Sequence, residues 1–331
     1  MAEIVLGVGS SHSPMVSMQG PDWLAWGRHG DPQHPMLYTE TGDHVTYDEQ
    51  LADVNGSFDD RITDAVVSAG ATRVHAAVDR LHQAIVDAHL DAIIIVGDDQ
   101  DEHLFADNLP PFLLYWGDTI ANAGMDSLGP DTPEVVRRFM PGYHEDGPGR
   151  DYPVDVALAR HLIDHLLDHD FDIASSNQLP NDDRRMGHAF AFPLRRLARA
   201  PIPVVPVMVN TYNPPAQPRA GRCLHFGRAI GEAIRAFPTD ARVGVIASGG
   251  LSHFLVLEDL DRRVLAALER GDLDELCAIP EETFVAGTSE IKNWIVAAGA
   301  CEARAFETVD YVPGYRTPAG TGTGLGFAMW Q

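Results

Sequence analysis

The sequence predicts an α/β protein, a single domain around a central mixed sheet that helices flank. Two observations lead to this prediction: short apolar runs typical of buried strands recur along the chain, and stretches with helical periodicity lie between them. The chain has 331 residues, 45% of them hydrophobic, and we expect one domain over 1–331. Some connections are too short to be crossovers, so antiparallel strands are expected beside parallel ones.

Each element is predicted from its pattern of apolar residues. The run 92–97 is apolar throughout, as in a strand buried on both faces. Before it, Val74, Val78 and Leu81 recur at spacings of three and four, which predicts an amphipathic helix over 72–90. In chain order, we expect strands at 3–9, 92–97, 112–116, 171–174, 204–209 and 243–247, and helices at 72–90, 154–169, 221–237, 258–270 and 288–299.

Two segments break the alternation of strands and helices. Residues 17–60 contain Trp23, Trp26 and Tyr38 among glycine, proline and aspartate, and residues 117–153 are rich in the same three small or polar types. Long irregular loops in a compact domain are usually functional or disordered, and disordered linkers are poor in Trp and Tyr. We therefore expect 17–60 to be an irregular, aromatic-rich insertion that forms a lid over a site.

Composition excludes several classes of partner. A formal net charge of −24 repels phosphate backbones and anionic membrane surfaces, so neither nucleic acid nor membrane is an expected partner. No run of about 18 apolar residues occurs, and the chain enters its first apolar run without a basic leader, which favours a cytoplasmic location. Three scattered cysteines fit neither a disulfide framework nor a thiolate metal site.

Three histidines follow an apolar run or a glycine turn. His12 ends the first run, His188 follows a glycine, and His253 comes after Gly249 and Gly250 behind the run 243–247. The carboxyl ends of strands are where α/β proteins bind ligands, and glycine lets a backbone approach a ligand closely. Each histidine by itself could also be a satisfied turn residue.

A late glutamate adds to these histidines. Glu290 precedes Ile291, Trp294 and Ile295 in a helical stretch, so its helix is expected to be buried, whereas a helical glutamate is usually solvated. Together with the three histidines, this carboxylate suggests a mononuclear metal site with its own acid/base residues.

The segment 97–105 places many polar groups after the most apolar strand. It reads Gly-Asp-Asp-Gln-Asp-Glu-His-Leu-Phe. Burying such groups is costly unless a metal, a substrate or a hydrogen-bond network satisfies them. A turn and a helix cap supplied by Asp98 and Asp99 is the simpler alternative.

Five ordered motifs together resemble one family, the class III extradiol ring-cleavage dioxygenases. This superfamily includes the protocatechuate 4,5-dioxygenase catalytic subunit, gallate dioxygenase and 3-O-methylgallate dioxygenase. The resemblance covers nearly the whole chain apart from 17–60. The motifs are Ser11-His12-Ser13-Pro14, Asp98-Asp99-Gln100 leading to Pro110-Pro111-Phe112, Asn177-Gln178 with Gly187-His188 and Pro193-Leu194, Gly249-Gly250-Leu251-Ser252-His253, and Glu290 with Trp294.

The resemblance implies a non-haem Fe(II) bound by two histidines and a glutamate. His12 matches the first histidine and Glu290 the glutamate, leaving open positions for a catechol and dioxygen. It also implies that His253 is the acid/base residue and that His188 orients the substrate. Asn177, Ser252 and Arg184 are predicted to contact the substrate in the same way.

The chain departs from the family at the second metal histidine. An ungapped count back from Phe112 places Gln100 there, and the nearest imidazole is His103. We expect Gln100 to occupy the ligand position, directly or through water. His103 is the main competitor because imidazole is the better ligand for Fe(II), and His34 or His44 of the insertion could substitute.

Two functions stay open on the sequence alone. The first is extradiol cleavage of a catechol-type ring, similar to protocatechuate, gallate or 3-O-methylgallate, with a small aromatic substrate and dioxygen as partners. The second is a dioxygenase-fold protein that binds metal or a partner without cleaving rings, as in the Memo-like branch. A benzoate would need a cation, and Arg184, Arg185 and Arg316 lie in loops that could reach it. We expect a homo-oligomer, a dimer.

Overall fold

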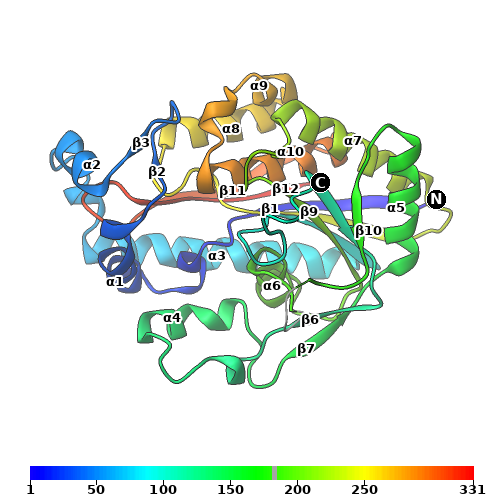
Figure 1. Ribbon diagram of the computed structural model, residues 1–331, viewed down its shortest axis with the longest axis horizontal. Coiled ribbons are helices and arrows are strands. Elements are labelled where there is room, and N and C mark those ends of the chain that lie inside the picture. The colour runs from blue at the N-terminus through cyan, green and yellow to red at the C-terminus, as the bar shows by residue number, and fades with distance from the viewer. Residues whose placement is uncertain (181–184) are drawn as a thin grey trace.

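The computed structural model describes residues 1–180 and 185–331, and it is built around an eight-stranded sheet (Figure 1). The strand order is β11-β12-β1-β10-β4-β9-β5-β8. The strands are β1 Glu3–Ser10, β4 Ala92–Gly97, β5 Phe112–Tyr115, β8 Ala174–Ser176, β9 Val204–Val209, β10 Arg242–Ser248, β11 Phe306–Tyr315 and β12 Gly322–Trp330. The helices are α1 Gly20–Gly30, α2 Tyr47–Val54, α3 Asp64–Ala88, α4 Glu134–Phe139, α5 Val156–Asp168, α6 His188–Phe192, α7 Ala220–Ala236, α8 Glu258–Arg270, α9 Leu273–Cys277 and α10 Ile291–Ala300.

The sheet is mixed, which confirms the predicted fold class. Its centre is parallel, since β1 pairs with β10, β10 with β4, and β4 with β9 in the same direction. Antiparallel pairing occurs where β5 meets β9 and where β12 meets β1 and β11. Across the described ranges 1–180 and 185–331, no helix is both long and apolar enough to cross a membrane.

Strand β4 shows how the sheet is buried on both faces. Ile94 and Val96 pack in one apolar cluster, and Ile93 and Ile95 pack in the other. Because successive side chains of a strand point to opposite faces, a strand covered on both sides is continuously apolar. The helices α7 and α10 lie over the first face, and α3 and α6 lie over the second (Figure 1).

The two strands β11 and β12 were not predicted from the sequence. Their stretch contains Gly322, Gly324 and Gly326, a composition more typical of loops. The structure explains two of these glycines, because a Cβ at Gly324 would lie 1.9 Å from a carboxylate oxygen of Asp261 and one at Gly326 would lie 2.9 Å from Leu251. Glycine is required here so that neighbouring side chains can approach the strand.

The segment 17–60 is more regular than expected. It contains α1, α2 and a short hairpin of β2 Leu37–Tyr38 and β3 His44–Val45. Trp23 is 1% exposed, packs in the core, and donates its Nε1 hydrogen to the Met15 carbonyl oxygen at 2.8 Å. The expectation of an irregular loop is therefore wrong, and part of the segment belongs to the core of the domain.

The segment 117–153 also contains regular structure. It forms the antiparallel hairpin of β6 Thr119–Asn122 and β7 Arg150–Pro153, with α4 between the two strands. Phe139, at the end of α4, is buried in the same apolar cluster as the side chains between α3 and the sheet. This brings a second layer of side chains over the sheet edge at which β1, β4 and β10 end.

Candidate active site

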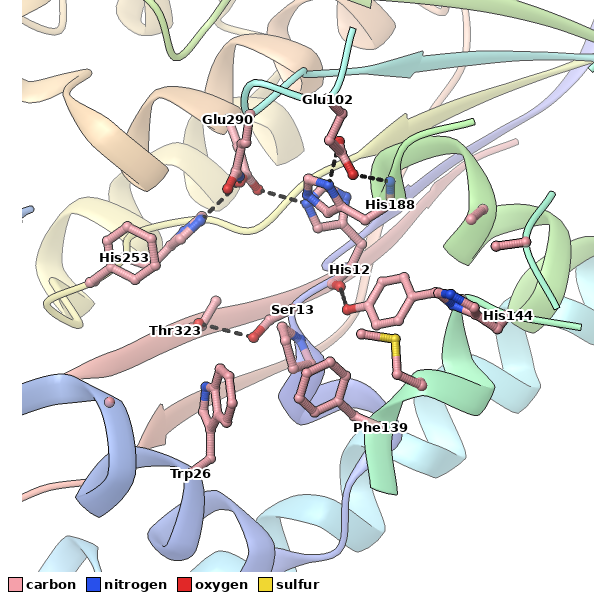
Figure 2. A pocket seen from close by; sticks show the side chains of 18 of the residues that line it. His12, Ser13, Trp26, Glu102, Phe139, His144, His188, His253, Glu290 and Thr323 are labelled. Carbon is pink, nitrogen blue, oxygen red and sulfur yellow. Dashed lines mark hydrogen bonds and ion pairs between the residues drawn. The ribbon is translucent and has the colours of Figure 1, made fainter. Parts of the chain in front are cut away.

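A single cavity of about 380 Å³ opens at the carboxyl edge of the parallel strands (Figure 2). Residues that follow β1, β4 and β10 form its inner end, and parallel strands bring their carboxyl ends to one edge. Helices α1, α4 and α6 supply much of its wall. The residues that line it include His12, Ser13, Trp26, Asp31, His34, Gln100, Glu102, Phe139, Met140, Tyr143, Met186, His188, His253, Phe254, Glu290, Arg316 and Thr323.

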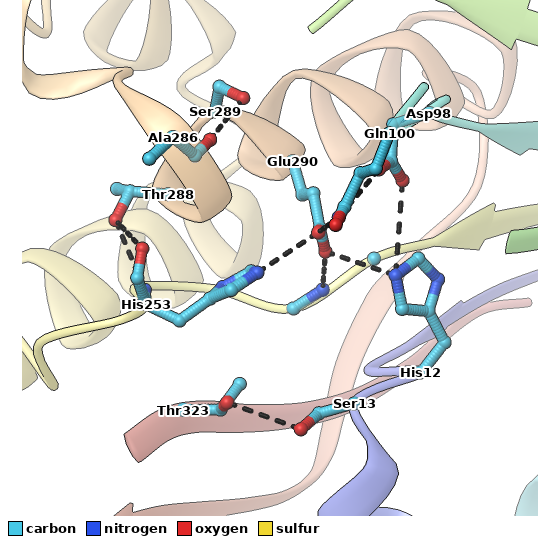
Figure 3. A network of polar contacts seen from close by, with 12 residues as sticks. His12, Ser13, Asp98, Gln100, His253, Ala286, Thr288, Ser289, Glu290 and Thr323 are labelled. Carbon is cyan, nitrogen blue, oxygen red and sulfur yellow. Dashed lines mark hydrogen bonds and ion pairs between the residues drawn. The ribbon is translucent and has the colours of Figure 1, made fainter. Parts of the chain in front are cut away.

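Glu290 is the centre of the polar network at the inner end (Figure 3). Its Oε1 atom lies 2.9 Å from Nε2 of His253 and accepts the Gln100 amide hydrogen at 3.0 Å. Its Oε2 atom lies 3.3 Å from Nε2 of His12 and accepts the backbone N–H of Gly250 at 2.6 Å. Glu290 ends the 3-10 turn Ala286–Glu290 and directly precedes α10. The sequence predicted that Glu290 lies within a helix at 288–299, whereas the structure places it in the turn before that helix.

His12 presents one defined nitrogen to this network. Its Nδ1 atom lies 2.9 Å from the Ser248 hydroxyl, and its backbone carbonyl accepts a hydrogen bond from the Tyr143 hydroxyl. Nε2 therefore faces both carboxylates, at 3.3 Å from Glu290 and 3.9 Å from Oδ1 of Asp98. His12 is only 3% exposed, so these contacts form in a nearly dry environment.

Asp98 and Gln100 lie together beside His12. Asp98 is 1% exposed and accepts hydrogen bonds from Gln100 at 3.2 Å and from Asn293 at 3.3 Å. Ligand atoms of His12, Asp98 and His188 lie within 4.8 Å of one another, close enough to share an ion. Asp99 instead caps the following turn, since its carboxylate accepts three backbone N–H groups, those of Glu102, His103 and Leu104.

His253 is held from both sides of its ring. Nδ1 lies 2.9 Å from the Leu251 carbonyl oxygen, and the backbone N–H donates to the Thr288 hydroxyl at 3.1 Å. The 3-10 turn before α10 packs against the ring, and a Cβ at Gly287 would lie 2.0 Å from its Cδ2 atom. Glycine at 287 is therefore needed for the imidazole to reach Glu290.

His188 begins α6 and is fixed by Glu102. One oxygen of Glu102 accepts the His188 backbone N–H at 2.9 Å, and the other lies 2.8 Å from Nδ1 of the ring. The His188 and His12 rings meet edge to face with their centres 4.6 Å apart. Sequence reasoning placed Glu102 in a polar segment but gave it no role, although its position five residues after β4 was the available signal.

Burial and charge oppose each other at these groups. Burial disfavours the charged form of Glu290, but the imidazoles of His253 and His12 outweigh it and hold the pKa of this carboxyl well below its usual range. Burial, followed by the charge of Glu290, raises the pKa of Asp98. Burial also disfavours a charged His188, yet the Glu102 carboxylate outweighs it and raises the pKa of His188 to about 10.

Several predicted site residues lie elsewhere. His103 lines a different cavity together with Leu104 and Phe105. Ser252 is fully buried, donates its hydroxyl to Asp261 at 2.8 Å, and does not line the active-site cavity. Its hydroxyl therefore holds the turn before α8 and is directed to Asp261.

The remaining predicted contacts are also distant or not described. Asn177 is exposed and lines a shallow pocket beside β6. His44 lies in β3, where its Nε2 atom is 2.9 Å from the Pro35 carbonyl oxygen. Arg184 lies outside the described residues. Of the insertion's histidines named as substitutes, His34 reaches the cavity.

Residues 63–326 match the family described as the catalytic LigB subunit of aromatic ring-opening dioxygenase. This match covers most of the chain, and the chain belongs to this family, the class III extradiol dioxygenases. It is an enzyme of the ring-cleaving dioxygenase class.

Curated relatives carry names that agree with this family. The chain is 26% identical over 324 residues to 2,3-dihydroxyphenylpropionate/2,3-dihydroxicinnamic acid 1,2-dioxygenase of Comamonas testosteroni, covering 78% of this chain and 89% of the relative. It is 28% identical over 233 residues to the protein of the same name from a Rhodococcus species, covering 66% and 65%. It is 34% identical over 116 residues to gallate dioxygenase of Pseudomonas putida, covering 33% of this chain and only 32% of that relative.

Substituting Gly287 with alanine is expected to displace the His253 ring and to lower turnover by about 10²-fold, because small misplacements of a reacting group are that costly. The added methyl would otherwise lie 2.4 Å from Nε2 of His253. Turnover should be measured together with the thermal unfolding midpoint. Gly221→Ala is the control, since a Cβ at Gly221 meets no atom within 4 Å. Equal turnover in both variants would contradict this expectation, because it would show that the turn Ala286–Glu290 can shift without displacing the His253 ring.

Proposed function

We propose that this enzyme uses Fe(II) and dioxygen for extradiol cleavage of a catechol-type ring, similar to protocatechuate, gallate or 3-O-methylgallate. The observation that carries the proposal is the buried group of His12, Glu290 and His253 at the inner end of an aromatic-sized cavity, with the buried Asp98 carboxylate 3.9 Å from Nε2 of His12. The names of the curated relatives support the same chemistry.

The residues present suit a divalent metal. Asp98 and Glu290 are two nearly dry carboxylates, and a cation between them would compensate charges that are otherwise costly to bury. Ligand atoms at right angles around a metal lie about 3 Å apart, and His12 Nε2 and Glu290 Oε2 are separated by 3.3 Å. Imidazole with carboxylates is a donor set that binds Fe(II).

We propose that His12 and Glu290 hold the iron and that the segment 98–100 supplies the third contact. Asp98 is the stronger candidate, because the amide nitrogen of Gln100 is used as a donor to both Asp98 and Glu290. The amide oxygen of Gln100, directly or through water, is the alternative. When bound, Fe(II) would bring the catechol oxygens and dioxygen together, so that the ring opens beside the two hydroxyl-bearing carbons and not between them.

The protein itself determines where a proton can be held. The Leu251 carbonyl can only accept, so Nδ1 of His253 carries a hydrogen and the exchangeable position is Nε2, which faces the cavity beside Glu290. This is the position for taking a proton from a catechol hydroxyl and returning it later. His188 has its Nδ1 hydrogen directed to Glu102, which leaves Nε2 for orienting the substrate.

The cavity walls suit a flat aromatic ring. Phe139, Met140, Met186 and Phe254 line the cavity and give part of its wall an apolar surface. Such a surface binds a ring by apolar contact and excludes water from the reacting atoms. Trp26 from the insertion lines the same wall, so we propose that this part of 17–60 covers the site. The homodimer and the cytoplasmic location stay predictions.

The test is anaerobic loading with Fe(II), followed by oxygen uptake and absorbance with protocatechuate, gallate, 3-O-methylgallate and unsubstituted catechol. We expect at least one to consume oxygen and to give a yellow ring-opened product. Iron bound in stoichiometric amount without oxygen uptake on any catechol would contradict the proposal and favour the Memo-like alternative of metal or partner binding.

A further inference from the structure

One part of the cavity wall, called the outer end and formed by Asp31 and Arg316, carries a single strong cation. Of the described residues that line the cavity, Arg316 is the only arginine or lysine. It follows β11 and is 4% exposed overall. Among 48 acidic residues in a chain of net charge −24, an arginine enclosed in the wall of an active site needs a specific explanation.

One edge of this guanidinium is fixed and the other is available. Nε donates to Oδ2 of Asp31 at 2.7 Å, and Nη1 lies 3.8 Å from the sulfur of Met15. Nη2 has no hydrogen-bond partner within the described ranges, and Arg316 lines the cavity. Asp31 also accepts a hydrogen bond from the Thr321 hydroxyl, which helps to fix the position of the Asp31–Arg316 ion pair.

His34 adds a second donor beside Arg316. The Met36 backbone N–H donates to Nδ1 of His34 at 3.2 Å, so Nε2 carries the hydrogen of the neutral ring. Burial, and then the Arg316 charge, lowers the pKa of His34 to about 4, which keeps it neutral near pH 7. Its ring packs on Phe254, with centres 3.9 Å apart, and lines the cavity.

The separation of the two ends matches one substituted ring. Thr321 contacts Asp31 at the outer end, and Thr323 lies 3.3 Å from Ser13 near the His253 turn. Thr321 directly precedes β12 and Thr323 is its second residue, so the two positions are at most about 7 Å apart along the backbone. A catechol with its hydroxyls at the inner end would place a ring substituent near the outer end.

We propose that Arg316 and His34 form an anion anchor, and that a carboxylate on the ring or on a short side chain of the proposed catechol substrate binds to these two residues. The identity of the ring as a catechol rests on the proposed function. The binding of an anion by Arg316 and His34 does not depend on it. Arginine suits the role because Nη2 can donate a charge-assisted hydrogen bond to a carboxylate while Nε stays paired with Asp31. Arg316 is then a specificity-determining residue.

Binding can be measured without turnover. In the metal-free protein, isothermal titration with benzoate and 3-phenylpropionate is expected to show binding, and the neutral benzamide is expected to bind more weakly. The variant Asp31→Asn/Arg316→Gln removes the cation without leaving a lone buried carboxylate, which would otherwise destabilise the fold. We expect its Kd for the carboxylates to rise about 10- to 100-fold, as for loss of a hydrogen bond to a charged group.

Controls separate charge from folding. Arg316→Lys keeps the charge and should retain most of the carboxylate preference, and Arg304→Gln, whose guanidinium pairs with Glu3 at 2.9 Å outside the cavity, should retain all of it. With Fe(II), the ratio of kcat/KM for protocatechuate to that for catechol should fall about 10- to 100-fold in the double variant.

Two results would overturn the assignment of the anchor. The first is that neither carboxylate binds to the unaltered protein, and the second is that the double variant loses affinity for benzoate and for benzamide to the same extent. Carboxylate binding that depends on Arg316, in a protein that consumes no oxygen with any catechol, would support the anchor while contradicting the ring-cleavage function. The two proposals therefore fail separately.

Discussion

The Glu290→Gln variant is expected to lose metal binding, with affinity for Fe(II) at least about 100-fold weaker, since even residues that only orient metal ligands change affinity 10- to 100-fold. Glutamine has nearly the same shape, so the bond from Gly250 can persist while the negative charge is removed. The measurement is iron content after anaerobic loading and dialysis, with circular dichroism to confirm that the variant is folded.

His103→Ala is the matched control for this experiment. His103 lies after the same strand β4, but it lines a separate cavity, so its removal should leave iron content unchanged. Loss of iron in His103→Ala with retention in Glu290→Gln would reverse the ligand assignment. Gln100→His is informative beside them, because an imidazole next to Glu290 should preserve or strengthen iron binding.

Replacing His253 with alanine is expected to lower kcat by roughly 10² to 10⁴, the usual contribution of general acid/base catalysis, with iron still bound. The physical reason is that Nε2 is the exchangeable position beside Glu290, while Glu290 keeps its contacts with Gly250 and Gln100 when the imidazole is absent. Iron content and oxygen uptake should be measured on the same sample.

A histidine outside the cavity gives the comparison for His253. His225 is exposed on α7, and His225→Ala should keep both iron and turnover. Full turnover in His253→Ala would remove this residue from proton transfer, and loss of iron would instead make it a metal ligand.

The fold could be predicted to the extent that its elements have regular patterns. Strand β4 is an uninterrupted apolar run because both of its faces are covered, and α3 carries an apolar stripe, so both were found, although α3 begins at Asp64 rather than near residue 72. The edge strands β11 and β12 were missed, since their glycines admit side chains from neighbouring elements, a tertiary cause that no local pattern reveals.

The site could be predicted in part. His12, His188 and His253 follow an apolar run or a glycine turn, Glu290 belongs to an apolar helical stretch, and the structure brings all four together. Ser252 belongs to the same glycine turn, but whether its hydroxyl faces substrate or Asp261 depends on a carboxylate nine residues later. Glu102, Asp31 and Arg316 acquire their roles from partners far along the chain, so their environment cannot be read locally.

The central place of β1 has a consequence for how the protein is made. Of the eight strands of the sheet, β1 is translated first, yet it pairs with β10 and β12, and the Ser11 hydroxyl bonds to Gly324, 313 residues further along. Non-local pairings of this kind form late and leave apolar strands exposed until their partners arrive. We therefore expect the nascent chain to need protection during synthesis and to bind metal only after Glu290 and β12 have been translated.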